Sequence, residues 1–130
     1  MGAKILIVDD EPDVVAVVQG RLVSAGYEVT VMADGQQALE CVKKHPPDLM
    51  VLDVMLPTLN GYEVCTMIKQ DIRYRAIPVV MLTARTEEKD VRLGRECGAD
   101  AYLLKPFQAN ELMQTIQALL RSGSGERPTP

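Results

Sequence analysis

Short apolar runs alternate with longer amphipathic stretches along this chain, and this rhythm limits the possible fold more than any other feature. The apolar runs are Lys4–Val8, Tyr27–Met32, Leu49–Leu52, Pro78–Leu82 and Ala101–Leu104. Continuous apolar strands separated by helices are typical of a parallel sheet that is covered on both faces. The sequence therefore predicts an α/β domain with a central parallel sheet. The run Tyr27–Met32 alternates in polarity, so it is predicted to lie nearer the sheet edge.

The stretches between these runs carry apolar residues at helical spacing. The predicted helices are 11–25, 36–44, 61–70, 87–97 and a last helix marked by Leu112, Ile116, Leu119 and Leu120. Pro12 near the start and Gly26 after the end favour the first of them. Helix 87–97 is the least firmly specified, because its apolar stripe is poor and Gly94 lies in its middle.

The composition fits one globular domain. A chain of 130 residues can bury a core, and its 47% hydrophobic and 25% charged residues suggest neither disorder nor a membrane protein. A net charge of −4 with interspersed signs argues against direct nucleic-acid contact by this segment. The N-terminus enters a strand at once and lacks the layout of a signal peptide. Residues 1–121 are predicted to form the domain, and residues 122–130 a flexible tail or the start of a linker.

The three cysteines, Cys41, Cys65 and Cys97, are odd in number and widely spaced. This pattern is neither a disulfide framework nor a set of zinc ligands. Each cysteine falls in a predicted helix, so we expect free, partly buried thiols in a reducing compartment, the cytoplasm.

Polar side chains follow four of the predicted strands at the point where each strand ends. Asp9 and Asp10 follow the first strand, Asp53 the third, Thr83 the fourth and Lys105 the fifth. In an open parallel α/β sheet the carboxyl ends of the strands form the edge where ligands bind, at the point where strand order reverses. The sequence therefore predicts that these residues converge on one crevice.

This group of side chains suits phosphoryl transfer to Asp53. Three carboxylates held close together repel, so one takes up a proton or a cation neutralises them. Magnesium prefers a few carboxylates and several waters. A magnesium ion and the Lys105 ammonium would attract phosphoryl oxygens, with the Thr83 hydroxyl as a further donor. Asp53 beside them can then act as a nucleophile and become an aspartyl phosphate.

Each residue also has a simpler structural interpretation when it is considered alone. Asp10 could cap the first helix, and Asp53 could also be a helix cap. Thr83 could bond the backbone at its strand end, and Lys105 could lie along the surface with its ammonium in water. Asn60 fits a turn or a helix cap. Only the joint arrangement favours the chemical interpretation.

Several short motifs occur in an order and spacing that is highly specific as a set. They are Ile5-Leu6-Ile7-Val8-Asp9-Asp10-Glu11-Pro12, Leu52-Asp53 with Leu56-Pro57 and Asn60-Gly61, Leu82-Thr83-Ala84, and Gly98-Ala99-Asp100 leading to Lys105-Pro106-Phe107. On these motifs, residues 3–121 resemble a response-regulator receiver domain of two-component signalling (CheY-like). The resemblance implies a flavodoxin-like (βα)5 three-layer sandwich with strand order 2-1-3-4-5. It also implies a phosphorylation-dependent signalling switch.

The resemblance further implies roles for the site residues. Asp53 accepts phosphate from a sensor histidine kinase or a phosphotransfer protein. Asp10 and Asp53 bind Mg²⁺ together with the backbone carbonyl of Met55, and Asp9 supports the ion, partly through water. Such a domain catalyses its own phosphorylation and dephosphorylation and is not a conventional enzyme.

A switch mechanism is implied as well. Lys105 pairs with the phosphoryl group, Thr83 swings to bond it, and Tyr102, at an aromatic switch position, turns inward. The surface formed by the fourth helix, the fifth strand and the last helix then changes and controls an output domain or a partner protein. By family likeness, the bond between Lys105 and Pro106 is expected to be cis.

Two positions depart from a common variant of the family. Receivers attached to winged-helix DNA-binding domains often dimerise through ion pairs, using an acid just after Gly-Ala-Asp and an Arg in the last helix. Ala101 and Thr115 stand at those positions here, which argues against dimerisation through this face.

Other classes of protein serve as alternatives. A haloacid-dehalogenase-type phosphatase needs a second Asp two residues after the nucleophile, where Met55 stands. A flavodoxin-type cofactor binder needs a Ser/Thr/Gly-rich phosphate loop after the first strand, where the acidic residues 9–11 stand. A receiver that serves as an unphosphorylated docking module stays open, although the acids, Thr83 and Lys105 argue against it.

Overall fold

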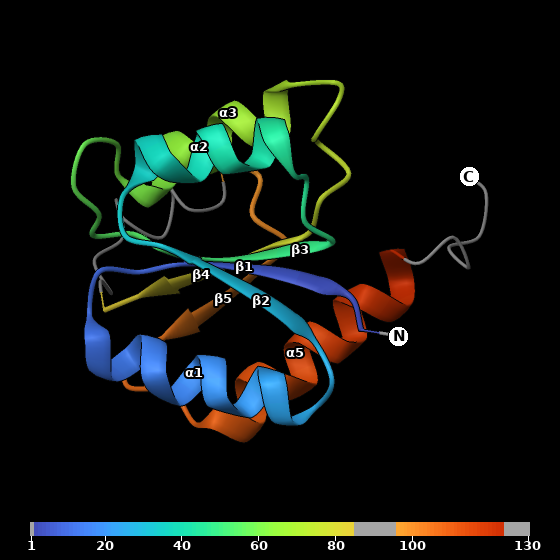
Figure 1. Cartoon of the computed structure of the whole chain (residues 1–130). Coiled ribbons are helices and arrows are strands. Elements are labelled where there is room, and N and C mark those ends of the chain that lie inside the picture. The colour runs from blue at the N-terminus through green and yellow to red at the C-terminus, as the bar shows by residue number, and fades with distance from the viewer. Residues whose placement is uncertain (1, 85–95, 124–130) are drawn as a thin grey trace.

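The computed structural model describes residues 2–84 and 96–123, which form a three-layer α/β sandwich (Figure 1). Its elements are, in chain order, β1 (Lys4–Val8), α1 (Pro12–Ser24), β2 (Glu28–Met32), α2 (Gly35–Lys44), β3 (Leu49–Asp53), α3 (Gly61–Gln70), β4 (Val79–Thr83), β5 (Ala101–Leu104) and α5 (Ala109–Gly123). Residues 85–95, which follow β4, lie outside the described part of the chain.

Neighbouring strands pair in parallel, in the order β2-β1-β3-β4-β5. Helices α1 and α5 cover one face of the sheet, and α2 and α3 cover the other, as Figure 1 shows. The predicted strand order and the edge position of the second strand are therefore confirmed. The order reverses at β1, because the chain first runs outward to β2 and then returns to place β3 on the other side of β1. Ligands of such sheets bind at this reversal point.

The sheet divides the core into two apolar clusters. The cluster beneath α2 and α3 includes Leu6, Met50 and Val64, and the cluster beneath α1 and α5 includes Ile7, Val51 and Ile116. Strands β3 and β4 are buried along their whole length. Full burial of one large apolar side chain contributes about 1.5–3 kcal/mol. The central strands are therefore firmly held and provide a rigid support for the side chains at their ends.

The local sequence determines how α3 begins beside the end of β3. The Asn60 side chain accepts a hydrogen bond from the Glu63 N–H at 2.9 Å, and the Glu63 side chain accepts one from the Asn60 N–H at 3.0 Å. This reciprocal cap confirms the capping interpretation of Asn60. A Cβ at Gly61 would lie 2.3 Å from the carbonyl oxygen of Asp53. Glycine therefore allows α3 to start directly against the backbone of Asp53.

Some predicted bounds differ from the observed ones. Strand β4 starts at Val79, because Pro78 has no N–H to donate to the sheet. Of the predicted helix 87–97, only the last two residues are described. Helix α5 extends to Gly123, past the predicted domain boundary at residue 121. Residues 124–130 lie outside the described part, so the flexible tail stays a prediction.

Three smaller predictions can also be compared with the structure. The peptide bond between Lys105 and Pro106 is cis, as predicted. None of the three cysteines forms a disulfide, but Cys65 and Cys97 are buried, and only Cys41 is partly buried as expected. No helix within the described residues has the length and apolar character needed to cross a membrane.

Candidate functional site

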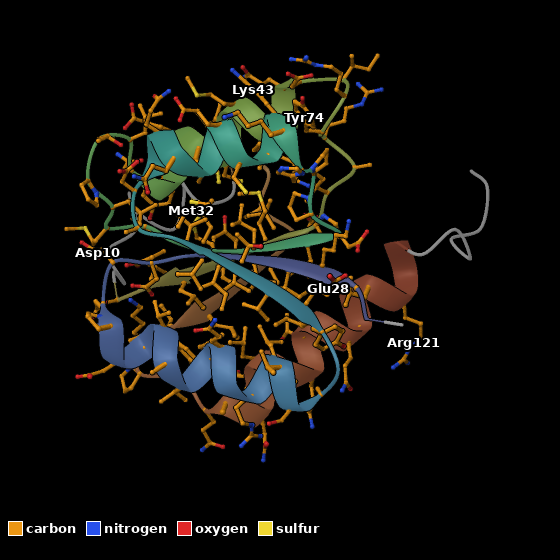
Figure 2. All side chains as sticks on the ribbon, viewed as in Figure 1. Asp10, Glu28, Met32, Lys43, Tyr74 and Arg121 are labelled. Atoms are coloured by element: carbon orange, nitrogen blue, oxygen red, sulfur yellow. The ribbon has the colours of Figure 1, made fainter. Side chains whose placement is uncertain are left out.

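The predicted polar residues meet at the carboxyl edge of the sheet. Asp9 follows β1, and Asp53 ends β3, the neighbour of β1 on the side where the order reverses. Thr83 ends β4, and its carbonyl accepts a hydrogen bond from the Lys105 N–H at 2.8 Å. Figure 2 shows Asp10 at the same edge, where the chain leaves β1 for α1. The structure thus brings the residues from four strand ends together, as the sequence predicts.

Three carboxylates form the centre of this edge. One carboxylate oxygen from each of Asp9, Asp10 and Asp53 can be chosen so that all three lie within 4.8 Å of one another. Asp9 and Asp53 are each 2% exposed, whereas Asp10 faces solvent. Buried carboxylates that face each other are costly unless positive charge or hydrogen bonds compensate them.

Lys105 supplies positive charge to this cluster. Its ammonium nitrogen lies 3.2 Å from an Asp53 oxygen and 3.6 Å from an Asp9 oxygen. It also donates a hydrogen bond to the Glu11 carboxylate at 2.7 Å. The Lys105 side chain is only 15% exposed, so the interpretation as a surface lysine is wrong. Glu11 is a site residue that sequence reasoning missed, and its place directly after Asp10 was the signal that could have found it.

The hydrogen bonds leave part of the cluster unsatisfied. Asp9 Oδ1 accepts from the Glu11 N–H at 2.9 Å, and Asp53 Oδ1 accepts from the Met55 N–H at 3.4 Å. The second oxygens, Asp9 Oδ2 and Asp53 Oδ2, are buried and have no hydrogen-bond partner among the described residues. A hard divalent cation bound by a few carboxylates would satisfy such oxygens and offset the excess negative charge. The donor set therefore fits Mg²⁺.

Burial is the main cause of the pKa shifts at this edge. Together with the neighbouring charge of Asp9, it raises the pKa of Asp53 to about 6, although Lys105 acts in the opposite direction. Burial also raises the pKa of Asp9. Burial alone lowers the pKa of Lys105, but the hydrogen bond to Glu11 and the charges of the two aspartates outweigh it and leave this pKa raised. Lys105 is therefore charged at neutral pH, while Asp53 takes up a proton readily just below it.

Three further predicted residues surround the cluster in different ways. Thr83 is 6% exposed at the end of β4. The Met55 side chain is 57% exposed, while its N–H points to Asp53. Tyr102, on β5, packs against the apolar cluster beneath α2 and α3. Their roles in metal binding and switching stay predictions.

The capping interpretations of the two aspartates are wrong. Glu11, not Asp10, occupies the N-cap position of α1, and it makes no side-chain capping bond. Asp53 lies within β3, and Asn60 caps the helix that follows. Neither carboxylate is therefore needed to hold a helix end, which leaves both available for a ligand.

The fold and this edge together define a class of protein. It has a doubly wound parallel sheet of order 2-1-3-4-5, an acidic cluster at the reversal point and a lysine after the last strand, as expected of a response-regulator receiver. The family described as response regulator receiver domain matches residues 5–117. The chain belongs to this family.

Characterised relatives agree with this assignment. The chain is 44% identical over 129 residues to the alkaline phosphatase synthesis transcriptional regulatory protein PhoP of Bacillus subtilis, a match that covers 99% of this chain and 53% of that protein. It is 43% identical over 126 residues to the DNA-binding response regulator MtrA of Mycolicibacterium smegmatis, covering 97% and 54%. The chain therefore spans about half the length of these curated relatives.

Solved structures share the fold. The chemotaxis response regulator CheY4 of Vibrio cholerae matches with a TM-score of 0.85 and 34% identity, over 92% of this chain and 99% of that one. The receiver domain of the sensor histidine kinase PA1611 from Pseudomonas aeruginosa matches with a TM-score of 0.86 and 34% identity, over 94% and 100%. That domain was solved with a magnesium ion coordinated in its active site cleft. The predicted family, fold and signalling class are thus confirmed.

Proposed function

We propose that this domain is a phosphorylation-dependent switch that accepts a phosphoryl group on Asp53. The proposal rests on the surroundings of the two Asp53 carboxylate oxygens at the reversal point of the sheet. One of its oxygens is buried without a hydrogen-bond partner among the described residues, and the other lies 3.2 Å from the Lys105 ammonium. A carboxylate in this position is available as a nucleophile. A sensor histidine kinase or a phosphotransfer protein would supply the phosphoryl group.

In the proposed transfer, an Asp53 oxygen bonds to phosphorus while the bond from phosphorus to the donor imidazole nitrogen breaks. The electron pair of that bond stays on the imidazole, which takes up a proton. Lys105 stabilises charge on the phosphoryl oxygens, because it is already held beside Asp53 and its raised pKa keeps it charged. Attack of water on the acyl phosphate later returns the carboxylate and inorganic phosphate. The domain would thus catalyse its own phosphorylation and dephosphorylation without being a conventional enzyme.

The proposed ligands of Mg²⁺ are the carboxylates of Asp9, Asp10 and Asp53 and the backbone carbonyl of Met55. The clustering of the three carboxylates and the unsatisfied oxygens of Asp9 and Asp53 support this set. When bound, the ion would neutralise the carboxylates and the incoming phosphoryl charge. Without it, the pKa of Asp53, raised to about 6, means that protonation weakens the nucleophile as the pH falls from neutral.

We propose that switching runs from Thr83 to Tyr102. The Thr83 hydroxyl would bond the new phosphoryl group, and Tyr102 would then turn inward. The two residues belong to neighbouring strands, since Tyr102 pairs with Met81, two positions before Thr83. The charge added at Asp53 would in this way reach β5, α5 and the segment 87–97, which the sequence predicts to be a helix.

A groove beside Lys105 supports docking of the phosphoryl donor. It has a volume of about 460 Å³ and lies between α1 and the segment that follows β5, with Val14, Val17, Pro106 and Phe107 among its lining residues. Val17 is 58% exposed on α1. Exposed apolar side chains next to a reactive site are typical of a protein interaction surface. We therefore place the donor protein over this groove.

The output of the switch is proposed to be a further domain or a separate partner protein. Relatives of about twice this length, named as transcriptional or DNA-binding regulators, support the first option. The proposed compartment is the cytoplasm, and the absence of a disulfide among the three cysteines supports a reducing environment.

Phosphorylation by the small donor acetyl phosphate tests the proposal. With Mg²⁺, the wild-type chain is expected to gain one acid-labile phosphoryl group in intact-mass spectra, whereas Asp53→Asn gains none. Asp34→Asn is the matched control, because Asp34 caps α2 and lies outside the site, and it is expected to label like the wild type. A chelator should stop labelling.

Three results would count against parts of this proposal. Labelling of Asp53→Asn at the wild-type level would show that the acceptor is wrong, and full labelling in the presence of chelator would remove the metal from the mechanism. Failure of the folded wild type to label would favour the unphosphorylated docking module.

A further inference from the structure

Cys65 and Cys97 form a buried contact that the phosphorylation mechanism does not use. Cys65 lies on α3, and Cys97 lies in the turn that precedes β5; they are 0% and 4% exposed. The Cys65 thiol donates a hydrogen bond to the Cys97 carbonyl oxygen at 3.3 Å. Residues 32 positions apart in the sequence are thereby brought together in the core beneath α2 and α3.

The surrounding contacts hold this pair in place. Lys69, one helical turn after Cys65, forms an ion pair with Asp100 at 2.8 Å. Gly98 packs so closely on α3 that a Cβ there would lie 3.2 Å from Lys69 Cγ. The turn is thus fixed against α3 directly after Cys97, which keeps Cys97 beside Cys65 and raises the effective concentration of one thiol near the other.

The two thiols also differ in acidity. The side-chain contact with Cys65 lowers the pKa of Cys97 against the effect of burial, and backbone hydrogen bonds of Ala99 and Cys97 act in the same direction. The same contact raises the pKa of Cys65. A thiolate is the reactive form of cysteine, so Cys97, the more acidic thiol, is the nucleophile of the pair.

We propose that Cys65 and Cys97 are an oxidative modification site at which hydrogen peroxide forms a reversible disulfide between α3 and the turn before β5. The Cys97 thiolate attacks one peroxide oxygen, the O–O bond breaks, and the departing hydroxide takes a proton to become water. The Cys65 sulfur then attacks the sulfur of the resulting sulfenic acid, and water leaves with the Cys65 proton. In total, two thiols and one peroxide give one disulfide and two waters.

The position of this disulfide would connect it structurally to the receiver site. It would join α3 to the turn that leads into β5, the strand that carries Tyr102 and is followed directly by Lys105. Cytosolic disulfides of this kind are typically transient and redox-sensing. The existence of the disulfide does not depend on the proposed function of Asp53.

Mass spectrometry of the full chain tests the proposal. The reduced protein is treated with hydrogen peroxide while folded, its remaining thiols are alkylated in denaturant, and the product is digested with trypsin. Lys and Arg residues separate the three cysteines in the sequence, so each falls in a different peptide. The expected product links the Cys65 and Cys97 peptides, lacks two hydrogens, and returns to the reduced mass with dithiothreitol.

Variants sharpen the test. Cys41→Ser removes the remaining, half-exposed thiol on α2 and is expected to give the same linked product as the wild type. Cys97→Ser is expected to leave Cys65 fully alkylated. A link through Cys41, or oxidation of Cys65 and Cys97 to unlinked acids only, would overturn the proposal. So would a link that forms only when peroxide is added to urea-unfolded protein, and this comparison needs no variant to fold.

Discussion

Strand β5 has a lysine–aspartate pair at each of its ends. At its amino end, the Lys69 ammonium bonds Asp100 at 2.8 Å and also donates to the backbone carbonyls of Arg75 and Ile77. The same Asp100 oxygen accepts from the Val79 N–H at 2.8 Å. This cluster matches one ammonium to three acceptors, so its polar groups hold the loop between α3 and β4 against β5.

At the carboxyl end, Lys105 faces Asp53 and Asp9, and here some of the hydrogen-bond acceptors lack a donor within the described part of the chain. Each aspartate retains one buried oxygen without a hydrogen-bond partner among the described residues, and Asp10 adds a further negative charge. Buried polar groups are normally satisfied, so exceptions of this kind need an explanation, such as an ion that binds there. We infer from this difference that the same residue pair stabilises the fold at one end of the strand and forms part of a ligand site at the other.

The largest expected effect is on the free energy of unfolding. Replacing the aspartate by asparagine should change it with opposite sign at the two ends of β5. Asp53→Asn removes a buried charge that has too few partners, so it should stabilise the metal-free protein at neutral pH by up to about 3 kcal/mol. This follows because the pKa of Asp53 is raised from 3.8 to about 6 by burial and by Asp9. Urea unfolding in the presence of chelator measures the difference. Destabilisation by Asp53→Asn would contradict the account.

The pH dependence of this gain has a defined direction. The folded-state pKa of Asp53 lies above its unfolded value, so the folded state binds the proton more tightly. The stability that the proton contributes is fully present below a pH of about 4 and is lost as the pH rises through about 6. Wild type and Asp53→Asn should therefore be equally stable near pH 4 and diverge up to pH 7. A difference that stays constant over this range would mean that packing, not charge, distinguishes them.

The same substitution at the other end should have the opposite sign and a smaller size. Asp100→Asn keeps an oxygen for the Val79 N–H but removes the charge that Lys69 faces, so it should destabilise the protein by about 1 kcal/mol. The expected loss is modest, because the Asp100 side chain is 36% exposed. Urea unfolding under the same conditions gives the matched comparison. A gain in stability would show that the Asp100 carboxylate, too, is a charge with too few partners.

The sequence predicted the carboxyl end well, for a topological reason. Parallel strands bring their carboxyl ends to one edge, so Asp9, Asp53, Thr83 and Lys105 could be grouped without knowing any side-chain conformation. The strand bounds followed from apolar runs that are buried on both faces, such as β3 and β4.

The features that escaped prediction depend on contacts between distant segments. The bond from Lys105 to Glu11 spans 94 positions and is set by a side-chain conformation, not by a pattern. The Lys69 cluster needs the path of the loop after α3, which brings the Ile77 carbonyl within 2.7 Å of the ammonium. The contact of Cys65 with Cys97 arises in the same way, because it joins a helix to a turn that no spacing rule places.

Magnesium titration of the folding stability tests whether the carboxyl end of the sheet binds the ion. Urea unfolding of wild type, Asp53→Asn and Asp100→Asn is measured with rising Mg²⁺. A ligand at a hundred times its dissociation constant stabilises its folded protein by about 2.7 kcal/mol. We expect wild type and Asp100→Asn to gain this stability in parallel, and Asp53→Asn to gain far less. Equal stabilisation of Asp53→Asn and wild type would contradict the claim that the unsatisfied carboxyl end of the sheet is the ligand site.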